Sequence, residues 1–564
     1  MSDKTFPLEV VLCWHMHQPQ YKNLATQEFA LPWTYLHGIK DYVDMAAHLE
    51  KYKKAKAVVN FAPILLEQIL DYCDQIRGHF QKQTPIKDIL LNCLATACPQ
   101  TEQERLTIIK ACLCANKVRL VQRYPAYEQL AFHANRILEV PDQLGYFNDE
   151  FFRDLVVWFH LAWMGETVKR EHADVKALIA KARHYSPDDG KKLLAIVGEQ
   201  MESIVPRYRE LARQGKVELS FTPYAHPIVP LLLSIDSALE AMPNATIPGG
   251  DYPGGEERAL WHVHKGMEVI EQHFGQKPAG CWPSEGGVSN ATASLLASAG
   301  VRWMATGQQV LHNSLSKLHP SLDQVGLNRY VYQIGEQDIH CFFRDDGLSD
   351  LIGFTYADWH ADDAVANLIH HLETIAATNP EQPNRILSII LDGENAWEYY
   401  PENGYYFLDA LYSKLSQHPS LKLTTFSDYL NGKPAVRLLP SLVAGSWVYG
   451  TFSTWIGDPA KNRAWELLIA AKVAFDAFVK TKKPKNLEDI LQQLAICEGS
   501  DWFWWFGDYN PAVAVKTFDQ LYRTHLKNLY QLMGVSPPEI LEQPISLGSE
   551  HSTAMGTMLK GTES

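Results

Sequence analysis

The chain has 564 residues, of which 46% are hydrophobic and 11% aromatic, enough to bury a sizeable core in two to four domains; this excludes disordered and fibrous classes. The 65 acidic and 51 basic residues give a formal net charge of −14 without a long basic run, which argues against a nucleic-acid partner. Nine cysteines form no CxxC pair, and the sequence has neither a signal-peptide pattern nor an apolar run of about 18 residues. We therefore expect reduced thiols, no membrane partner and a cytoplasmic location.

Strands and helices alternate along most of the chain. The first element is an almost wholly apolar strand at 8–14, and 41–215 has mostly helical periodicity. Helices are predicted at 64–74, 102–124, 154–164 and 256–274. Further strands are predicted at 217–221, 280–283, 300–306, 340–343 and 386–391. Apolar strands that end in polar residues indicate a parallel α/β sheet or barrel with a site at the carboxyl ends of its strands.

The pattern changes after residue 430. Pro- and Gly-bearing turns and a Trp-rich loop at 445–458 precede amphipathic helices, which are predicted at 460–480, 486–497 and 511–533. Residues 541–564 are rich in Gly, Ser and Thr, a composition typical of mobile tails. We expect a first domain at 1–430, a helical second domain at 431–540 that contributes to the cleft, and a flexible tail at 541–564.

Two histidines follow the first strand. His15 and His17 are two residues apart, so their side chains point to the same side of the strand. They are compatible with hydrogen-bonded core histidines and also with a metal-dependent hydrolase. The metal hypothesis needs further ligands; His226 is a candidate, but no HxxEH or HExxH motif is present. Both interpretations stay open from the residues alone.

Three carboxylates lie on or directly after predicted strands. Glu218 lies in an apolar strand, where a carboxylate must be paired or belong to a site. Glu285 lies on a Gly-bearing loop three residues after Trp282, and it is either an exposed turn residue or a site residue beside an aromatic wall. Asp392 ends the most apolar strand, a catalytic position in barrels, although it also suits a helix N-cap.

Glu285 and Asp392 are 107 residues apart in the sequence, yet loops at the strand ends of one sheet converge on one cleft. Two carboxylates, several aromatic residues and no evident phosphate loop favour glycosyl transfer. In that chemistry one carboxylate attacks or stabilises the oxocarbenium-like centre, and the other donates a proton to the leaving oxygen.

Five segments, in order, resemble the motifs of glycoside hydrolase family 57 over roughly residues 8–530. They are HMHQP at 15–19, GKVE at 215–218, WPSE at 282–285, LDGEN at 391–395, and TWIGD with KNRAW at 454–465. Residues 343–354 and 498–507 are also similar to the amylopullulanase-like branch of the family. One departure is Asp346, which stands where the family pattern leads us to expect a histidine.

The resemblance implies an incomplete (β/α)7 barrel followed by an α-helical domain. It also implies retaining hydrolysis or transglycosylation of α-glucans such as starch, glycogen or maltooligosaccharides, as in α-amylases, amylopullulanases and 4-α-glucanotransferases, with no metal or cofactor. Glu285 matches the family's nucleophile and Asp392 its acid/base. The remaining matches are site-lining positions and candidates for sugar stacking: His15, His17, Glu218, Trp282, Trp397, Trp455 and Trp502.

Two alternatives to this activity remain. A metal-dependent hydrolase would use His15 and His17, and a non-catalytic glucan-binding homologue would keep the motifs without the geometry that activity needs. The segment 234–258, rich in Gly and Pro, has the length of a lid that selects the accepted glucan.

Overall fold

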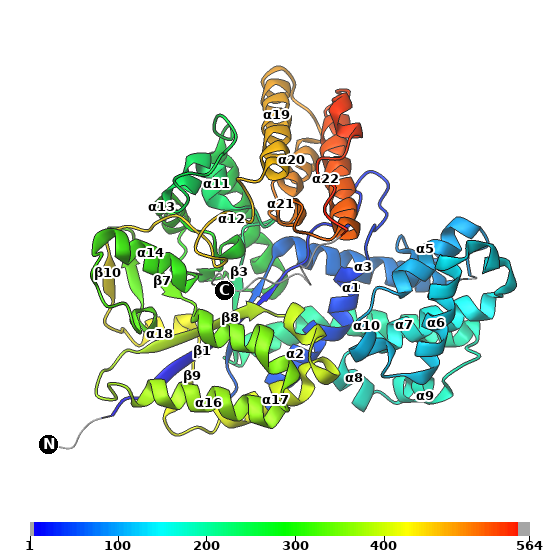
Figure 1. Ribbon diagram of the computed structural model, residues 1–564, viewed down its shortest axis with the longest axis horizontal. Coiled ribbons are helices and arrows are strands. Elements are labelled where there is room, and N and C mark those ends of the chain that lie inside the picture. The colour runs from blue at the N-terminus through cyan, green and yellow to red at the C-terminus, as the bar shows by residue number, and fades with distance from the viewer. Residues whose placement is uncertain (1–4, 97, 551–564) are drawn as a thin grey trace.

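The computed structural model describes residues 5–96 and 98–550 and is built around one curled sheet of ten strands (Figure 1). Seven of its strands pair in parallel in the order β8-β1-β2-β3-β4-β5-β7. Their bounds are β1 (Leu8–Met16), β2 (Ala57–Phe61), β3 (Val217–Phe221), β4 (Gly280–Cys281), β5 (Trp303–Thr306), β7 (His340–Phe343) and β8 (Ile386–Asp392). Successive strands of this parallel series are joined through helical segments, because a parallel pair needs a crossover connection.

The two end strands of this series, β7 and β8, come together just beyond the end of β7. Arg344, directly after β7, forms a parallel bridge with Ser388 of β8, and the Asp345 amide donates to the Ser388 carbonyl at 2.8 Å. Beyond β7 the sheet continues into β6 (Tyr332–Ile334), which is antiparallel to it, and then β10 (Arg437–Leu439), while β9 (Leu421–Leu423) pairs with β1. The predicted incomplete (β/α)7 barrel is thereby confirmed.

Strand alternation separates two apolar cores. On β1, Val11 and Cys13 belong to a small cluster inside the barrel, whereas Val10, Leu12 and Trp14 pack into the large core beneath the surrounding helices. Helix α18 (Phe426–Asn431) closes the amino end of the barrel with the ring of Phe426. His15 continues the inward-facing series at the opposite, carboxyl end.

Helices surround the barrel. Between β1 and β2 lie α1 (Trp33–His37), a π-helical turn (Gly38–Tyr42) and α2 (Val43–Lys51). After β3 come α11 (Val229–Leu233), α12 (Gly255–Phe274), α13 (Asn290–Ser298), α14 (Gln308–Leu318), α15 (Asp346–Asp350), α16 (Ala361–Ala377) and α17 (Tyr405–Leu415).

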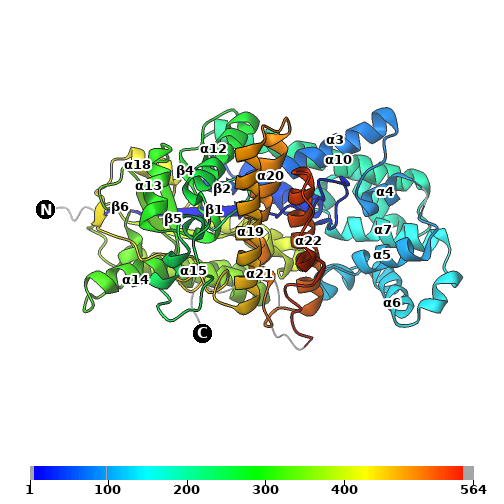
Figure 2. The same cartoon turned by 90° about the horizontal axis from the view of Figure 1, so that it is seen from above.

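A helical insertion separates β2 from β3 and extends to one side of the barrel in both views (Figures 1 and 2). Its helices are α3 (Pro63–Lys82), α4 (Ile89–Ala95), α5 (Glu102–Cys112), α6 (Pro125–Glu139), α7 (Asp149–Trp163), α8 (Glu166–Glu171), α9 (Ala173–Lys181) and α10 (Pro187–Arg213). The predicted helix at 102–124 is broken after Cys112, because Asn116 caps a separate π-helical turn (Lys117–Val121) by accepting hydrogen bonds from two amides. Strand β2 was not predicted, since a short buried apolar run does not distinguish a strand from a helix.

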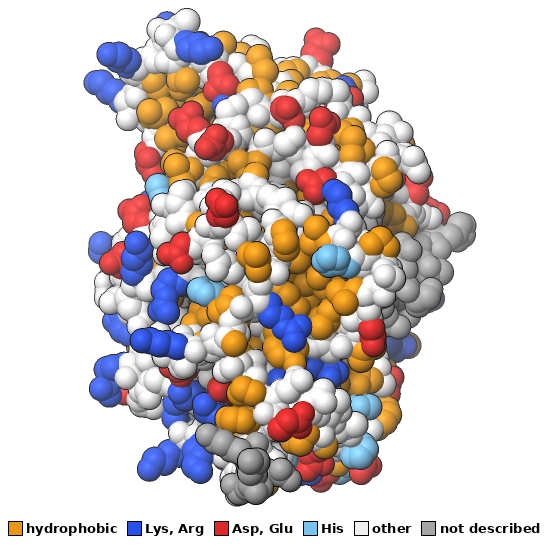
Figure 3. Space-filling view, turned by 90° about the vertical axis from the view of Figure 1, so that its left-hand side faces the viewer, with side chains coloured by type: hydrophobic (Ala, Val, Ile, Leu, Met, Phe, Trp, Pro, Cys, Tyr) orange, Lys and Arg blue, Asp and Glu red, His pale blue; other side chains and the backbone are white. Residues whose placement is uncertain are grey.

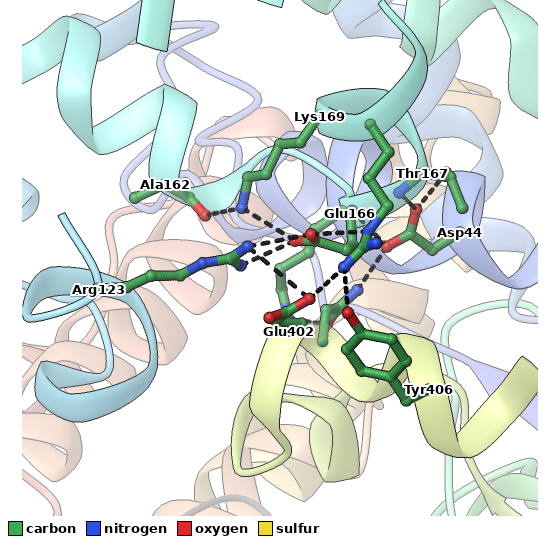
Figure 4. A network of polar contacts seen from close by, with 11 residues as sticks. Asp44, Arg123, Ala162, Glu166, Thr167, Lys169, Glu402 and Tyr406 are labelled. Carbon is green, nitrogen blue, oxygen red and sulfur yellow. Dashed lines mark hydrogen bonds and ion pairs between the residues drawn. The ribbon is translucent and has the colours of Figure 1, made fainter. Parts of the chain in front are cut away.

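A network of ion pairs and hydrogen bonds around the buried Glu166 joins the insertion to the barrel (Figure 4). Arg123 of the insertion lies 2.8 Å from Glu166, and Arg170 pairs with Glu402, which lies on a loop after β8. The amide of Glu166 in turn donates to Asp44 of α2 at 2.7 Å. A chain of charged contacts thus holds the insertion at a set position against the barrel.

A helical domain stands over the carboxyl ends of the strands (Figures 1 and 2). It consists of α19 (Pro459–Thr481), α20 (Leu487–Cys497), α21 (Asp501–Trp505) and α22 (Ala512–Leu532). Residues 541–550 of the expected flexible tail pack on this domain, because the amides of Ile545 and Ser546 donate to Asp519 of α22 at 2.7 and 3.3 Å. The rest of that tail, 551–564, lies outside the described residues.

The surface on the side of β10 carries scattered apolar side chains (Figure 3). Exposed hydrophobic residues of this part of the chain include Val325, Val436 and Leu438. No helix within 5–96 or 98–550 combines the length and the apolar character needed to cross a membrane.

Candidate active site

A cavity of about 640 Å³ opens at the carboxyl ends of the barrel strands. We call it the central cavity. The barrel, the segment after β1, the helical insertion and the helical domain all contribute to its walls. Among the residues that line it are His15, His17, Trp33, Glu285, Arg344, Asp392, Glu394, Trp447, Asp501, Trp504 and Trp505.

Asp392 is delivered to the cavity by the end of β8. It is in register with His15 of β1, so the two side chains lie in the same layer of the barrel. Its Oδ2 accepts a hydrogen bond from Asn395 Nδ2 at 2.9 Å, and the following helical turn is capped at Glu394, so Asp392 is not the N-cap. Burial raises the pKa of Asp392 to about 6, against the opposing effects of that hydrogen bond and of the charges of His17 and Arg344.

Glu285 lies on the turn after β4, in a left-handed backbone conformation with φ of 57°. A non-glycine residue held there costs about 1 kcal/mol or more, so its neighbours must hold the turn in place. Trp447 does so twice: its amide donates to the Glu285 carbonyl and its indole Nε1 to Oε2, both at 3.0 Å. Burial, followed by the charges of Asp392 and Asp501, raises the pKa of Glu285 well above its ordinary value. Glu285 is therefore no exposed turn residue.

The two carboxyl groups line one cavity and interact electrostatically. Asp392 is the largest charged contribution to the raised pKa of Glu285, after burial. Because two neighbouring carboxylates resist ionising together, the pair holds a proton more readily than either group would alone. Such a pair can supply one acid and one base at the same time.

A hydrogen-bonded chain that contains the imidazoles of His15 and His226 lies beside these carboxyl groups. His15 Nδ1 is 2.6 Å from Asn60 Oδ1, and His15 Nε2 is 3.1 Å from His226 Nε2. Burial lowers the pKa of His15 to about 3 and that of His226 well below its ordinary value, so both rings are neutral at physiological pH. His15 then donates to Asn60 and accepts from His226, whose Nδ1 accepts from Ser500 at 2.8 Å.

His17 connects the barrel to the helical domain. Its Nε2 lies 2.8 Å from Asp501 Oδ1 at the start of α21, and its ring stacks on His226 with centroids 3.8 Å apart. Its amide donates to Glu394 Oε1 at 3.1 Å. The roles of Asp501 and Glu394 were not predicted, although both lie in segments that resemble the family motifs. The sequence could not reveal that folding brings Glu394 and Asp501, which lie far apart in the chain, to the same histidine, His17.

The orientation of the rings argues against the metal hypothesis. Ligand atoms of His17, His226 and Asp501 lie within 4.8 Å of one another. The two imidazole planes, however, are stacked at 15°, and each nitrogen lone pair lies in its own ring plane. Two nearly parallel planes cannot direct their lone pairs to one ion at tetrahedral angles. These residues do not fit a metal centre.

Glu218 lies away from the cavity, inside the amino end of the barrel. It accepts hydrogen bonds from Trp303 Nε1 at 2.7 Å and from the amide and hydroxyl of Ser427 at 2.9 and 2.5 Å. Burial raises its pKa against these hydrogen bonds. Glu218 is therefore a hydrogen-bonded structural residue, paired with Trp303 and Ser427, and it does not line the central cavity.

The predicted tryptophans are buried rather than exposed to a ligand. Trp282 has no exposed surface and stands behind the site, with its ring 5.3 Å from that of Trp447. Trp397, Trp455 and Trp502 are at most 1% exposed and are not among the residues that line the central cavity. They leave no face on which a sugar could stack, which corrects that expectation. Partly exposed tryptophans line the cavity instead: Trp33, Trp447, Trp504 and Trp505.

The structure also places the predicted lid segment and Asp346. The segment 234–258 does not line the central cavity; Tyr252 and Thr246 tie it to the helical domain by hydrogen bonds with Glu498 and Asn462. Asp346, in place of the expected histidine, lies 2.9 Å from Arg344, whose guanidinium lines the cavity.

Comparisons with known proteins agree with this architecture. A family model described as Glycosyl hydrolase family 57 matches residues 11–441, more than half of the chain. The fold is similar to a branching enzyme from Thermococcus kodakaraensis (TM-score 0.57, 15% identity, 93% of this chain and 90% of that one). It is also similar to the α-amylase AmyC from Thermotoga maritima (0.57, 13%, 94% and 93%) and to a branching enzyme from Pyrococcus horikoshii (0.56, 16%, 99% and 99%). No curated protein matches the sequence significantly. The chain belongs to glycosyl hydrolase family 57.

Proposed function

We propose that this protein is a retaining glycosidase or transglycosidase acting on α-glucans, with Glu285 as nucleophile and Asp392 as acid/base. The observation that carries the proposal is that these two carboxyl groups line one cavity, that burial raises the pKa of both, and that the charge of Asp392 raises the pKa of Glu285 further. Family membership and the α-glucan enzymes among the similar structures support the substrate class. Partly exposed indole rings on the cavity wall suit the flat faces of pyranose rings.

In the first step, Glu285 attacks the anomeric carbon while Asp392 gives its proton to the departing glycosidic oxygen. The C–O bond to the leaving sugar breaks as the bond to Glu285 forms. In the second step, Asp392 takes a proton from water or from an acceptor hydroxyl, which then displaces Glu285. Water gives hydrolysis, and a sugar hydroxyl gives transfer.

The electrostatic coupling of Glu285 and Asp392 affects which of the two carboxyl groups carries the shared proton. An ionised Asp392 is one cause of the raised Glu285 pKa, so placing the shared proton on Asp392 removes that cause. The Trp447 indole N–H then favours the ionised form of Glu285. A proton on Asp392 thus lowers the pKa of Glu285, and protonated Asp392 with ionised Glu285 is the pair that the first step needs, although burial, the largest cause, raises both pKa values.

The polar groups around the pair are suited to sugar hydroxyls. His17 Nδ1 and Glu394 Oε2 are buried without a hydrogen-bond partner among the described residues, and both side chains line the central cavity. An unsatisfied buried donor or acceptor is costly, so a ligand hydroxyl that pairs with it gains affinity. We assign these atoms to substrate binding.

Replacing Glu285 with Gln tests the proposal. We expect hydrolysis and transfer on maltooligosaccharides, amylose and pullulan to fall at least about 1,000-fold, since the covalent step is lost. A mechanism-based glucosyl inhibitor should label Glu285 in the native enzyme and nothing in the variant. Unchanged turnover would remove Glu285 from the mechanism, and a wild-type protein that binds glucans without turnover would instead be a non-catalytic homologue.

The products separate the possible reactions. Shorter sugars alone mean hydrolysis, longer sugars mean transfer, and new α-1,6 links mean branching. Dialysis against a chelator separates the metal-dependent alternative, because a two-carboxylate glycosidase keeps its activity while a metal hydrolase loses it.

A further inference from the structure

A second cavity, of about 460 Å³, lies next to the central one. We call it the outer groove. It is lined by Asn116, Val118, Arg119, Gly353, Phe354, Ala357, Asp358 and Tyr399. Asn116, Phe354 and Tyr399 also line the central cavity, so the two spaces share a common wall. Nothing in the mechanism above uses the groove.

Hydrogen bonds between loops fix the shape of the outer groove. Arg119, on the π-helical turn of the insertion, donates from Nε to the Tyr399 carbonyl at 2.8 Å and from its terminal nitrogen to the Ala357 carbonyl at 3.4 Å. Asn116 Nδ2 donates to the Glu398 carbonyl at 3.2 Å. The insertion is thereby fastened to the loop that follows Asp392. Side chains of the insertion and backbone carbonyls of the loops after β7 and β8 thus hold the groove in shape.

The surface of the groove is amphipathic and nearly neutral. Tyr399 is 38% exposed and Phe354 is partly exposed, which provides aromatic faces. Asp358, whose side chain is 87% exposed, offers acceptors for hydroxyl groups and lies 3.8 Å from Arg119, so the only two charged residues of the lining oppose each other. Aromatic faces beside hydrogen-bonding groups without net charge suit an uncharged polyhydroxylated ligand better than an anion.

We propose that the outer groove binds further glucose units of the α-glucan chain whose reacting bond lies in the central cavity. This inference rests on the proposed function. The shared lining selects the occupant: Asn116, Phe354 and Tyr399 border both spaces, so the groove is the next surface that a chain extending past these residues from the central cavity would meet. The groove would then make the enzyme prefer chains long enough to fill both spaces, and the helical insertion would supply that preference.

The test measures affinity as a function of chain length. In a Glu285→Gln background, which keeps the ligand intact, titration calorimetry with maltooligosaccharides from three to ten units gives the ratio of long-chain to short-chain affinity. Val118→Trp places an indole at the mouth of the groove, and Asp358→Ala removes its acceptors. Both positions are exposed, Val118 by 61%, so neither change disturbs a core. Tyr146→Ala is the matched control, an 89% exposed aromatic of the same insertion that lines neither space.

We expect the ratio to fall at least fivefold in Val118→Trp and severalfold in Asp358→Ala, and to stay at the reference value in Tyr146→Ala. The same shift should appear in kcat/KM when these changes are made in the active enzyme. Reference ratios in both groove variants, with glucan binding and turnover intact, would overturn the groove and leave the proposed function standing. Failure of the Glu285→Gln protein to bind any chain, with no wild-type turnover, would overturn both.

Discussion

Replacing Asp392 with Asn should make the protein more stable at neutral pH although it removes the proposed acid/base. Burial raises the pKa of this carboxyl from 3.8 to about 6. The native state therefore holds the proton more tightly than the unfolded chain does, and between these two pKa values rising pH lowers the free energy of unfolding. Two pKa units correspond to about 3 kcal/mol, a penalty that is complete above pH 6 and absent below the unfolded value.

Asparagine has nearly the shape of aspartate, and its side-chain oxygen can still accept the hydrogen bond from Asn395. The variant also removes a charge that raises the Glu285 pKa, which adds to the gain. With an unfolding entropy of about 2 cal/mol/K per residue, 3 kcal/mol corresponds to a rise of about 2 to 3 °C in Tm for a chain of this length.

Differential scanning fluorimetry of wild type and Asp392→Asn from pH 4 to pH 8 measures this effect. The difference in Tm should be near zero at pH 4, grow through pH 5 to 6 and level off above. Asp338→Asn, at an exposed position, is the matched control for the loss of one carboxylate charge. A variant Tm equal to or below that of wild type at pH 7.5, or an equal gain at pH 4, would refute the assignment of Asp392 as a carboxyl destabilised by burial.

Three other predictions follow from the site. The kcat/KM of the wild type should fall as pH rises through about 6, because Asp392 must be protonated to donate; a glucosyl fluoride, whose leaving group needs no acid, should escape this fall, and an identical fall for it would exclude Asp392 as the acid. Asp501→Asn should lower kcat/KM about 10- to 100-fold with little change in Tm, because His17 loses the hydrogen bond that orients it. Added to His17→Gln it should cause almost no further loss, and additive effects would show that the two residues act independently. Trp397→Ala should lower the free energy of unfolding by about 3 to 5 kcal/mol, because it leaves a cavity in the core, whereas Trp504→Ala should raise KM at unchanged Tm. Thermal unfolding and kinetics of both variants test this pair, and a raised KM without lower stability for Trp397→Ala would contradict its burial.

Local pattern predicted several strands and helices and a parallel α/β sheet or barrel, and the family resemblance implied the incomplete (β/α)7 form. The apolar runs that become β1, β3 and β8 and the periodic stretches that become α12, α19 and α22 carry their period within one segment, so they were predicted from neighbouring residues. The family motifs likewise placed Glu285 and Asp392 after strands. Each of these features depends on residues close together in the chain. Strand β2 was not predicted, because its five buried residues, four of them apolar, are too few to show a distinguishing period.

The composition of the site depended on contacts between distant segments. Tryptophans 397, 455 and 502 look the same in sequence as Trp504 and Trp505, yet only packing determines which indole faces the cavity. Trp447 reaches Glu285 across 162 residues, and Asp501 reaches His17 across 484. A carboxyl's proton affinity depends on its burial and on the charges that folding brings near it. Sequence therefore indicated the fold and the two proposed acids, whereas three-dimensional packing decided which groups surround these carboxyls and how tightly they hold a proton.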